Sequence, residues 1–378
     1  MRRNVFYIDP QSYNNLSVYD HSLLKGIKDW QIHYFCNRKY DFKPLDGAKV
    51  HPFFHYSDYR KSWRKVLSYS GSLLRVMASV VRHLPAVVHV QWIHFWPLDY
   101  LFVIFLHLLR VKVVFTAHNL LPHVRRRGEG HLYRWYYEQV DAIIVHTQRT
   151  QQEMIENLHI DAKKVHVLRH GILDTEVDEV AVSRRVEELR AQLHLPTDAV
   201  IFSCLGMQNK YKGIDLVTRV WSHSKVLQGK SCYLLIVGRN VESIDYSEVK
   251  ALANVHILND KVSNLDFESY LRLSSVVLLP YTRISQSGLL FSAIQAGVPV
   301  LVSDVGGLTE PLSVAEVGWC IGRPKEETLA NVMERLANAP DEVARVRANA
   351  DAFQRVRKAY DWTEISASTN SLYHNLLQ

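Results

Sequence analysis

PYTRISQSGLLFSAIQAGVPV, residues 280–300, lies between two short apolar runs. A helix is expected over Leu289–Ala296, opening near Ser287-Gly288 after a polar loop. Gly297-Val298-Pro299 then ends that helix, because glycine suits the left-handed helix end and proline cannot continue a helix. The first amides of such a helix have no intrahelical partner, so they favour an anion such as phosphate. An ordinary strand-helix-strand unit without a ligand would carry the same pattern.

Short β-branched runs alternate with longer amphipathic segments along the whole chain, which indicates an α/β fold with parallel sheets. In the first half, strands are expected at 5–8, 31–35, 87–91, 111–117, 142–146 and 165–168, and helices at 19–28, 62–82, 97–109, 132–140 and 148–158. In the second half, strands are expected at 200–205, 233–237, 255–257, 275–279, 300–303 and 318–321, and helices at 214–224, 267–273, 289–296 and 326–338. Each half is therefore predicted to be a doubly wound unit, with near-continuous apolar strands covered on both faces.

The chain has 378 residues, which is more than one hydrophobic core usually serves, so two domains are expected. The join falls after His170-Gly171, where a charged segment from Asp174 to Arg190 precedes the strand that begins at Val200. Ligands of doubly wound sheets bind beyond the carboxyl ends of the strands. Two such units are therefore expected to form a binding cleft between them.

Several short segments occur in a recognisable order: Leu168-Arg169-His170-Gly171, Gly206 followed by Tyr211-Lys212-Gly213, Val237-Gly238-Arg239, the 280–300 stretch, and Asp304–Glu310. Together they resemble the GT-B glycosyltransferases, in particular the retaining enzymes of glycosyltransferase family 4, over nearly the whole chain. The resemblance implies two Rossmann-like domains facing across a cleft. The acceptor-binding domain would be 1–172, the donor-binding domain 173–358, and a C-terminal helix within 359–378 would pack back on the first domain.

The resemblance also implies a nucleotide-sugar donor site. In such enzymes a basic residue at the position of Lys212 contacts the donor pyrophosphate, where it can stabilise the departing nucleoside diphosphate. His118 follows a strand end, where relatives place a histidine that touches the donor sugar; a lone histidine is otherwise usually structural. His118 and Lys212 are the expected catalytic residues. The other expected donor contacts are Arg239, Arg283, Ser287, Gly288, Leu289, Ser292 and Glu310.

Two features depart from the family pattern. Met207-Gln208 stands where an arginine often follows the first glycine, so Arg239 or Arg283 would supply the second cation. Many members also carry two glutamates eight residues apart, and the corresponding positions here are Ile284 and Ser292. Ser292 can hydrogen-bond a ribose hydroxyl, though more weakly than a carboxylate. The loss predicts an unusual donor contact or lost activity; in one version Arg283 pairs with the carboxylate of a uronic-acid donor.

Acceptor contacts are expected from the first half of the chain. Tyr13, Asn14 and Asn15 follow the first strand and offer hydrogen bonds to sugar hydroxyls, and His123 follows His118 in the loop after a later strand. Helix capping is an equally good explanation of the two asparagines.

Charge is unevenly distributed. Residues 1–130 contain 19 Lys and Arg against 8 Asp and Glu, a balance of +11, and the remainder carries −4. A helical segment begins with the cluster Arg60, Lys61, Trp63, Arg64 and Lys65, a composition that favours an anionic membrane surface. A solvated helix face is the alternative. Nucleic acid is not an expected partner, because no motif that reads DNA or RNA occurs.

Cys36, Cys204, Cys232 and Cys320 lie far apart without zinc-ligand spacing, and no Asp-x-Asp motif occurs, so neither a metal nor another cofactor is expected. Together with these observations, the resemblance implies a cytoplasmic, peripherally membrane-bound retaining glycosyltransferase. UDP-sugars are favoured over GDP-sugars as donor, and a lipid-linked glycan of surface polysaccharide biosynthesis as acceptor. Two alternatives remain, a nucleotide-sugar epimerase of the same fold and a non-catalytic partner subunit.

Overall fold

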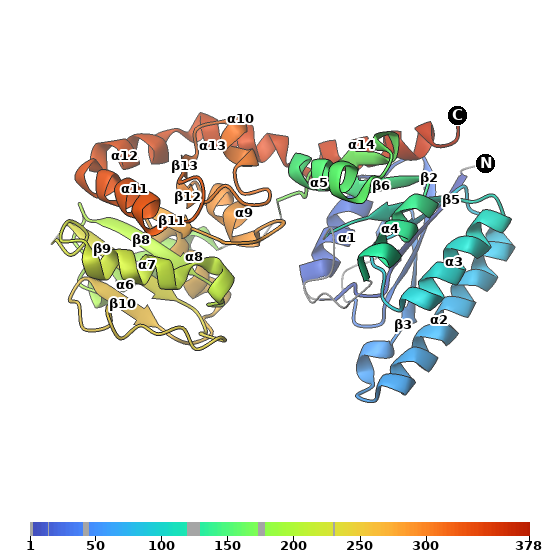
Figure 1. Cartoon of the computed structure of the whole chain (residues 1–378), viewed down its shortest axis with the longest axis horizontal. Helices are drawn as coiled ribbons and strands as arrows, with labels where there is room; N and C mark the ends of the chain where they lie inside the picture. The colour runs from blue at the N-terminus through green and yellow to red at the C-terminus, as the bar shows by residue number, and fades with distance from the viewer. Residues whose placement is uncertain (1–2, 14, 41–44, 119–128, 173–177, 230) are drawn as a thin grey trace. The chain divides into compact units, whose positions relative to one another are not determined.

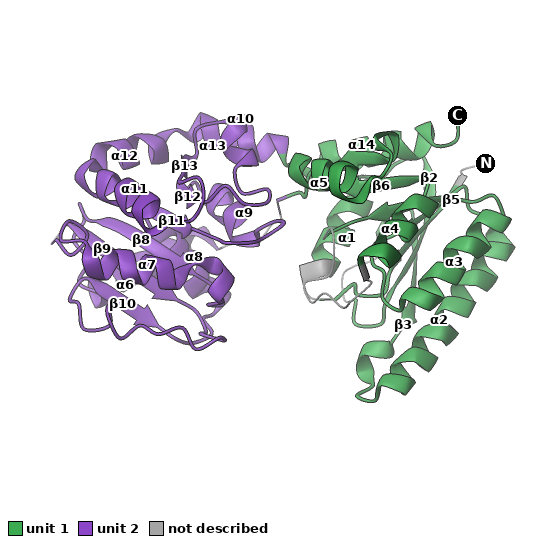
Figure 2. Cartoon of the chain, viewed as in Figure 1, with its two compact units in different colours: residues 1–171, 360–378 green, residues 172–359 purple. Residues whose placement is uncertain are grey.

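A computed structural model describes residues 3–13, 15–40, 45–118, 129–172, 178–229 and 231–378. The chain divides into two compact units (Figure 2). Unit 1 comprises Met1–Gly171 and Tyr360–Gln378, and unit 2 comprises Ile172–Ala359. The domain limits expected from the sequence differ from these by one residue at each join.

Unit 1 is built on a parallel sheet of seven strands in the order β3-β2-β1-β4-β5-β6-β7. The order reverses direction between β1 and β4, which is the topological switch point where such sheets bind ligands. Buried β-branched and aromatic residues form the central strands, as expected for a sheet covered on both faces. The bounds are β1 (Arg3–Asp9), β2 (Trp30–Asn37), β3 (Ala48–Phe54), β4 (Val87–Val90), β5 (Lys112–Thr116), β6 (Ala142–Val145) and β7 (Val165–Val167).

Helices cover both faces of this sheet (Figure 1). One core packs beneath α2 (Ser62–His83), α3 (Trp96–Leu108), α4 (Glu129–Gln139) and α5 (Gln148–Leu158), with short 3-10 turns at η1 (Tyr56–Asp58) and η2 (Ala162–Lys164). The second core lies beneath α1 (Asn15–Gly26) and α14 (Trp362–Asn375). Ser366 Oγ donates to the Leu23 carbonyl at 2.8 Å, and Trp30 Nε1 donates to Asn370 Oδ1 at 2.8 Å. The expected return of the C-terminal helix to the first unit is therefore confirmed.

Unit 2 contains a parallel sheet of six strands in the order β10-β9-β8-β11-β12-β13. Its central strands are wholly buried, so the doubly wound α/β prediction is confirmed for both units. The strand bounds are β8 (Val200–Leu205), β9 (Cys232–Val237), β10 (Val255–Leu258), β11 (Val276–Leu279), β12 (Val300–Val302) and β13 (Gly318–Cys320). The helices are α6 (Glu179–Gln192), η3 (Lys210–Lys212), α7 (Ile214–His223), α8 (Asn264–Leu273), α9 (Gly288–Gln295), α10 (Glu310–Val314), α11 (Glu326–Asn338), α12 (Pro340–Ala348) and α13 (Ala350–Ala359).

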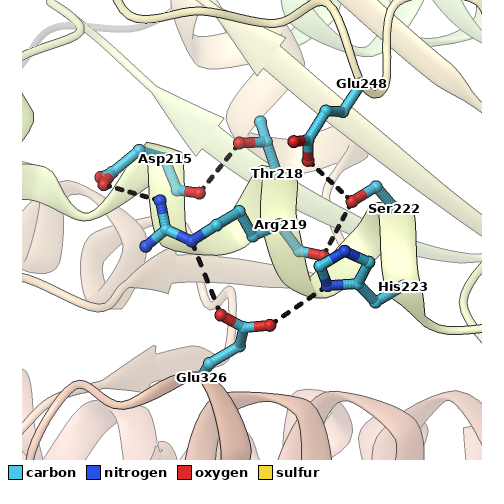
Figure 3. A network of polar contacts seen from close by, with 7 residues as sticks. All are labelled: Asp215, Thr218, Arg219, Ser222, His223, Glu248 and Glu326. Carbon is cyan, nitrogen blue, oxygen red and sulfur yellow. Dashed lines mark hydrogen bonds and ion pairs between the residues drawn. The ribbon is translucent and has the colours of Figure 1, made fainter.

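A surface network joins α7 to the first turn of α11 (Figure 3). Glu326 lies 3.6 Å from Arg219 Nε and 3.2 Å from His223 Nδ1, and Arg219 also pairs with Asp215 at 3.2 Å. Exposed ion pairs of this kind contribute about 0–1 kcal/mol each. The buried apolar face of α7, not this network, therefore supplies most of the packing energy.

Five of the strands and helices in the described ranges were not expected from the sequence: β3, α6, α10, α12 and α13. The edge strand β3 has a mixed burial pattern and contains Pro52, which an edge strand tolerates because it need not donate to a second neighbour. The helices α6, α12 and α13 are rich in charge and have a low mean hydropathy. None of the helices in the described part of the chain has the length and apolar character needed to cross a membrane.

Candidate active site

Three expected cations follow neighbouring strands of the unit 2 sheet. Arg239 follows β9, Lys212 follows β8 and Arg283 follows β11, and these strands are adjacent in the order β9-β8-β11. Parallel strands present their carboxyl ends at one edge of the sheet. The structure therefore places all three side chains in loops at the same edge, where Arg239 and Arg283 are exposed.

These loops touch through their backbones at glycine positions. A Cβ on Gly238 would lie 2.2 Å from the Gly206 carbonyl oxygen, and one on Gly213 would lie 2.3 Å from the Pro280 carbonyl oxygen. Both glycines also have positive φ angles, which larger residues rarely adopt. Thr282 N donates to the Tyr211 carbonyl at 2.8 Å, so the loops after β8 and β11 are fixed to each other.

Lys212 is a partly buried ammonium group at this edge. Its Nζ lies 3.5 Å from the position of a Cβ on Gly206, so the absence of a side chain there leaves room for the lysine. Burial lowers the pKa of Lys212 to about 8, and the neighbouring Cys204 thiol opposes that shift. A desolvated cation is a strong partner for an anion brought into the same site.

The start of α9 lies at the end of the loop after β11. Ser287 is the N-cap and accepts a hydrogen bond from Leu290 N at 3.4 Å. The buried phenol of Tyr281 is hydrogen-bonded to Ser287. A Cβ on Gly288 would meet no atom within 4 Å, so the first turn of α9 opens into free space. The amides of Gly288 and Leu289 belong to this first turn, whose N–H groups lack intrahelical acceptors.

The two positions that lack the family glutamates differ in their surroundings. Ser292 is partly buried and lies four residues after Gly288, on the same face of α9. Ile284 is held through its backbone, since a Cβ on Gly306 would lie 2.0 Å from the Ile284 carbonyl oxygen. Glu310 opens α10 after β12 and is partly buried, so the structure places a carboxylate after the next strand of the same edge.

In unit 1, His118 belongs to a chain of polar side chains at the carboxyl edge. His118 Nε2 lies 2.9 Å from Gln91 Oε1, and His118 Nδ1 lies 3.3 Å from His146 Nε2. Gln91 Nε2 donates to His89 Nε2 at 2.9 Å, and His89 Nδ1 lies 2.6 Å from the Tyr373 hydroxyl of α14. The chain therefore connects the expected catalytic histidine to the C-terminal helix.

The histidines of this chain are held in their neutral form. Burial lowers the pKa of His89 and of His146 to about 3, and it lowers the pKa of His118 well below its ordinary value. Trp92 stacks on His118 with ring centroids 4.5 Å apart. A neutral, fixed imidazole whose two ring nitrogens face Gln91 and His146 is poorly suited to proton transfer near neutral pH. Gln91 and Trp92 were not predicted, although they follow a buried strand directly.

A buried carboxyl pair supports the loop after β1. Asp9 and Asp20 are both almost fully buried and hydrogen-bond each other, and Tyr7 and Tyr34 donate to Asp20 at 2.7 and 2.6 Å. Burial and the charge of Asp20 raise the pKa of Asp9, so one carboxyl of the pair stays protonated. Asp9 Oδ1 accepts from Gln11 N at 2.6 Å, which fixes the backbone that leads into the expected acceptor loop.

Of the expected acceptor residues, Tyr13 is partly buried, and Lys39 Nζ lies over its ring at 5.6 Å. Asn15 is the first residue of α1, but its side chain is not described, and Asn14 and His123 lie outside the described residues. Of the five residues of the expected membrane contact, Arg60 and Lys61 directly precede α2 and the other three lie in its first turn. Arg60, Lys61, Trp63 and Arg64 are exposed. Across the described ranges, no group of three or more potential ligands is arranged to hold a metal ion.

Comparisons with known proteins cover both units. The model for Glycosyltransferase Family 4 matches residues 23–176, and the model for Glycosyl transferases group 1 matches residues 185–353. A D-inositol 3-phosphate glycosyltransferase of Corynebacterium glutamicum is 21% identical over 307 residues, which is 75% of this chain and 71% of the relative. A second such enzyme, from Streptomyces scabiei, is 24% identical over 67% of this chain and 57% of its own length.

Solved structures agree on the fold. Sucrose-phosphate synthase from Thermosynechococcus elongatus has a TM-score of 0.69 and 17% identity over 100% of this chain and 99% of its own. Anabaena Alr3699/HepE in complex with UDP has a TM-score of 0.69 and 13% identity over 99% of this chain and 100% of its own. The two family models, the two sheets and these neighbours lead to one assignment: the chain belongs to the GT-B glycosyltransferases of glycosyltransferase family 4.

Proposed function

We propose that this glycosyltransferase transfers a sugar, with retention of anomeric configuration, from a nucleoside diphosphate sugar held by unit 2. The observation that carries the proposal is Lys212, a desolvated ammonium group at the edge where the first turn of α9 also opens. Both groups are suited to a diphosphate, since one neutralises its charge and the other donates backbone hydrogen bonds.

In the proposed reaction the bond between the anomeric carbon and the diphosphate oxygen breaks as the acceptor oxygen attacks the same face of the sugar. Lys212 and the amides of Gly288 and Leu289 stabilise the negative charge on the departing diphosphate. That diphosphate takes the proton of the attacking hydroxyl. His118 contacts the donor sugar as a neutral imidazole and transfers no proton, so no side chain has to act as a base.

UDP-sugars are the proposed donors, with GDP-sugars next. The structural neighbour from Anabaena was solved in complex with UDP and with UDP-glucose, which supports uridine as the base. Both hexosyl and uronosyl donors fit the proposal. Arg283 is exposed after β11, beside the missing acid at Ile284, and a uronic acid would offer it a carboxylate.

For the acceptor we propose a glycan with an anionic lipid carrier, in surface polysaccharide biosynthesis at the cytoplasmic face of the membrane. The excess positive charge of residues 1–130 supports an anionic partner. The relative from Corynebacterium glutamicum is named for D-inositol 3-phosphate, which is also anionic.

Turnover of the donor separates the proposal from its rivals. Purified chain is incubated with UDP-sugars, with and without a membrane extract that contains lipid-linked glycans, and released UDP is measured. Release that needs the acceptor is expected. Release without acceptor would favour an epimerase or a hydrolase instead.

Donor binding is measured separately by thermal shift with UDP-, GDP- and ADP-sugars. Stabilisation by one nucleotide class is expected, and Lys212→Met should abolish it. Binding of a nucleotide without any release would fit a non-catalytic subunit, for which the missing acids at Ile284 and Ser292 are the favouring observation. If no nucleotide stabilises the protein, the assignment of the donor site is wrong.

A further inference from the structure

One face of α2 is apolar and open to solvent. Trp63, Leu67, Leu74 and Val81 are each between 56% and 64% exposed. Their spacing of four, seven and seven residues places them along one side of the helix, because the α-helix repeats every 3.6 residues. A different side of α2, about a third of a turn away, packs on the unit 1 sheet through Tyr69, Leu73, Val76 and Val80. The exposed stripe is therefore separate from the core.

A basic stripe runs beside the apolar one. Arg64, Arg75 and Arg82 are exposed and each follows an apolar position by one residue, which turns it about 100° around the helix. Arg64 also lies over the Trp63 ring, with 5.2 Å between the guanidinium carbon and the ring centroid. The sequence of α2 contains neither aspartate nor glutamate. Its outer surface is therefore cationic along its whole length.

The neighbouring helix α3 extends the apolar surface. Leu101, Ile104 and Leu108 are between 40% and 79% exposed, and their spacing of three and four residues places them along one side of α3. Trp96, the first residue of α3, adds a ring that is 48% exposed at the start of the helix. Asp99, the one acidic residue of α3, is buried and bonded to Tyr69 of α2 and to the His94 amide. Figure 1 shows α2 and α3 side by side on one face of the sheet. We call this surface, formed by the two exposed stripes and the three arginines, the α2–α3 face.

The two tryptophans of the α2–α3 face share a position in the fold. Each helix follows the carboxyl end of its strand, β3 for α2 and β4 for α3, so Trp63 and Trp96 both lie toward the carboxyl edge of the unit 1 sheet. His118 follows β5 at the same edge. Tryptophan prefers the interface between lipid and water. A bilayer contacted by both rings would thus lie near the proposed acceptor side of unit 1.

We propose that the α2–α3 face docks flat on an anionic lipid bilayer, with α3 as well as α2 inserted. The expected contact thereby extends from the Lys/Arg cluster at 60–65 to the full length of both helices. A second copy of the chain is a poor occupant, because it would oppose cationic stripes that carry no acidic complement. An apolar surface with flanking arginines matches both layers of a bilayer, the phosphates and the acyl boundary.

The test uses the full chain and vesicles of phosphatidylcholine, with or without half phosphatidylglycerol, in a sedimentation assay. Binding to the anionic vesicles is expected, with weaker binding at 0.5 M salt. The variant Arg64→Gln/Arg75→Gln/Arg82→Gln should bind about 100-fold more weakly, since each cation near an anionic surface contributes roughly a fivefold factor. The variant Leu101→Ser/Ile104→Ser/Leu108→Ser should lose at least about tenfold, which tests the part played by α3.

A matched control removes exposed apolar side chains from unit 2. Val180 and Leu265 are 70% and 40% exposed, and Val180→Ser/Leu265→Ser should leave vesicle binding unchanged. Circular dichroism melts of every variant report its folding. The proposal is overturned if wild type does not bind anionic vesicles, or if the α3 variant binds like wild type. It is also overturned if the α3 variant instead abolishes a concentration-dependent dimer.

The proposal rests on the proposed function only for its purpose, which is to bring unit 1 to a lipid-linked acceptor. Vesicle binding needs neither donor nor acceptor. If sedimentation fails while UDP-sugars still stabilise the chain, the docking surface alone is refuted. If the nucleotide assay fails while the vesicles bind, the donor site alone is refuted.

Discussion

Lys212 makes nucleotide binding depend on pH in a direction that can be measured. Its pKa is lowered to about 8 in the free chain, from an ordinary value of 10.5, because the ammonium group is partly buried. A bound diphosphate supplies the missing negative charge and is expected to return the pKa to its ordinary value or above. The difference between the two pKa values corresponds to about 3.4 kcal/mol. The chain with protonated Lys212 should therefore bind the nucleotide about 300 times more tightly than the chain with neutral Lys212.

Binding must therefore take up protons in the alkaline range. About half a proton per nucleotide is expected at pH 8 and about 0.9 at pH 9, against almost none at pH 6.5. The second phosphate ionisation lies near pH 6, so the nucleotide itself contributes little above pH 8. Calorimetric titration with UDP in Tris and in HEPES, which differ in ionisation enthalpy, measures this uptake directly.

Without nucleotide, the free energy of unfolding should rise as the pH rises from about 8 to about 10.5. An unfolded chain keeps the Lys212 proton up to about pH 10.5, whereas the folded chain releases it near pH 8, so this group lowers the stability of the folded chain below pH 8. Lys212→Met should raise the unfolding free energy at pH 7 by about 1–3 kcal/mol and abolish UDP binding. Lys210→Met, an exposed position in the same turn η3, is the control and should change neither. UDP binding without proton uptake at pH 9 would refute the role of Lys212.

Two further predictions concern a buried carboxyl group of unit 1 and two glycines of unit 2. Burial raises the pKa of Asp99 to about 6, so its ionisation is penalised in the folded state, and the unfolding free energy should fall as the pH rises from about 4 through 6. Asp99→Asn removes this titration. In urea melts, the free energy of unfolding of the variant relative to wild type should therefore rise by about 1 kcal/mol between pH 5 and pH 7. The same difference at both pH values would contradict a raised pKa of Asp99. Gly238→Ala should destabilise the chain by about 2–4 kcal/mol, because its Cβ would lie 2.2 Å from the Gly206 carbonyl oxygen. Gly288→Ala, which meets no neighbour, should keep the melting temperature but weaken UDP binding, and an equal loss of stability in both variants would show that Gly288 is not open to a ligand.

How far the sequence predicts this fold depends on the element. The buried strands and the helix after Ser287 were predictable, because a continuous apolar run favours a covered strand and a glycine-proline stop marks a helix end. The edge strand β3 was not, since partial exposure and Pro52 remove the alternation that marks a strand. Charged helices such as α13 were missed for a related reason. The packing of a few buried residues, here Phe353 and Val356, decides whether such a helix forms more than its composition does.

The candidate sites show the same division. The places of Lys212 after β8 and of Ser287 at the start of α9 could be expected, because a local signal, a glycine turn or a helix cap, marks each of them. Gln91 carries no such signal, because its role comes from strand neighbours: β4 lies beside β5, which brings Gln91 to His118 from 27 residues away in the chain. Tyr281 carries no local signal either. In the sequence it looks like an ordinary core residue, and only the structure shows its hydrogen bond to Ser287.

The path of the loop that contains position 284 does not depend on a glutamate side chain. Gly306 packs against the carbonyl of Ile284, and Gly307 N donates to the Ser285 carbonyl at 3.0 Å, so the path of this loop is set by main-chain contacts. A side chain at position 284 does not enter either contact. The proposed diphosphate contacts, Lys212 and the amides that open α9, likewise need neither glutamate. Loss of the two acids should therefore alter the recognition of the sugar and the ribose. The proposed contacts to the departing diphosphate do not depend on them.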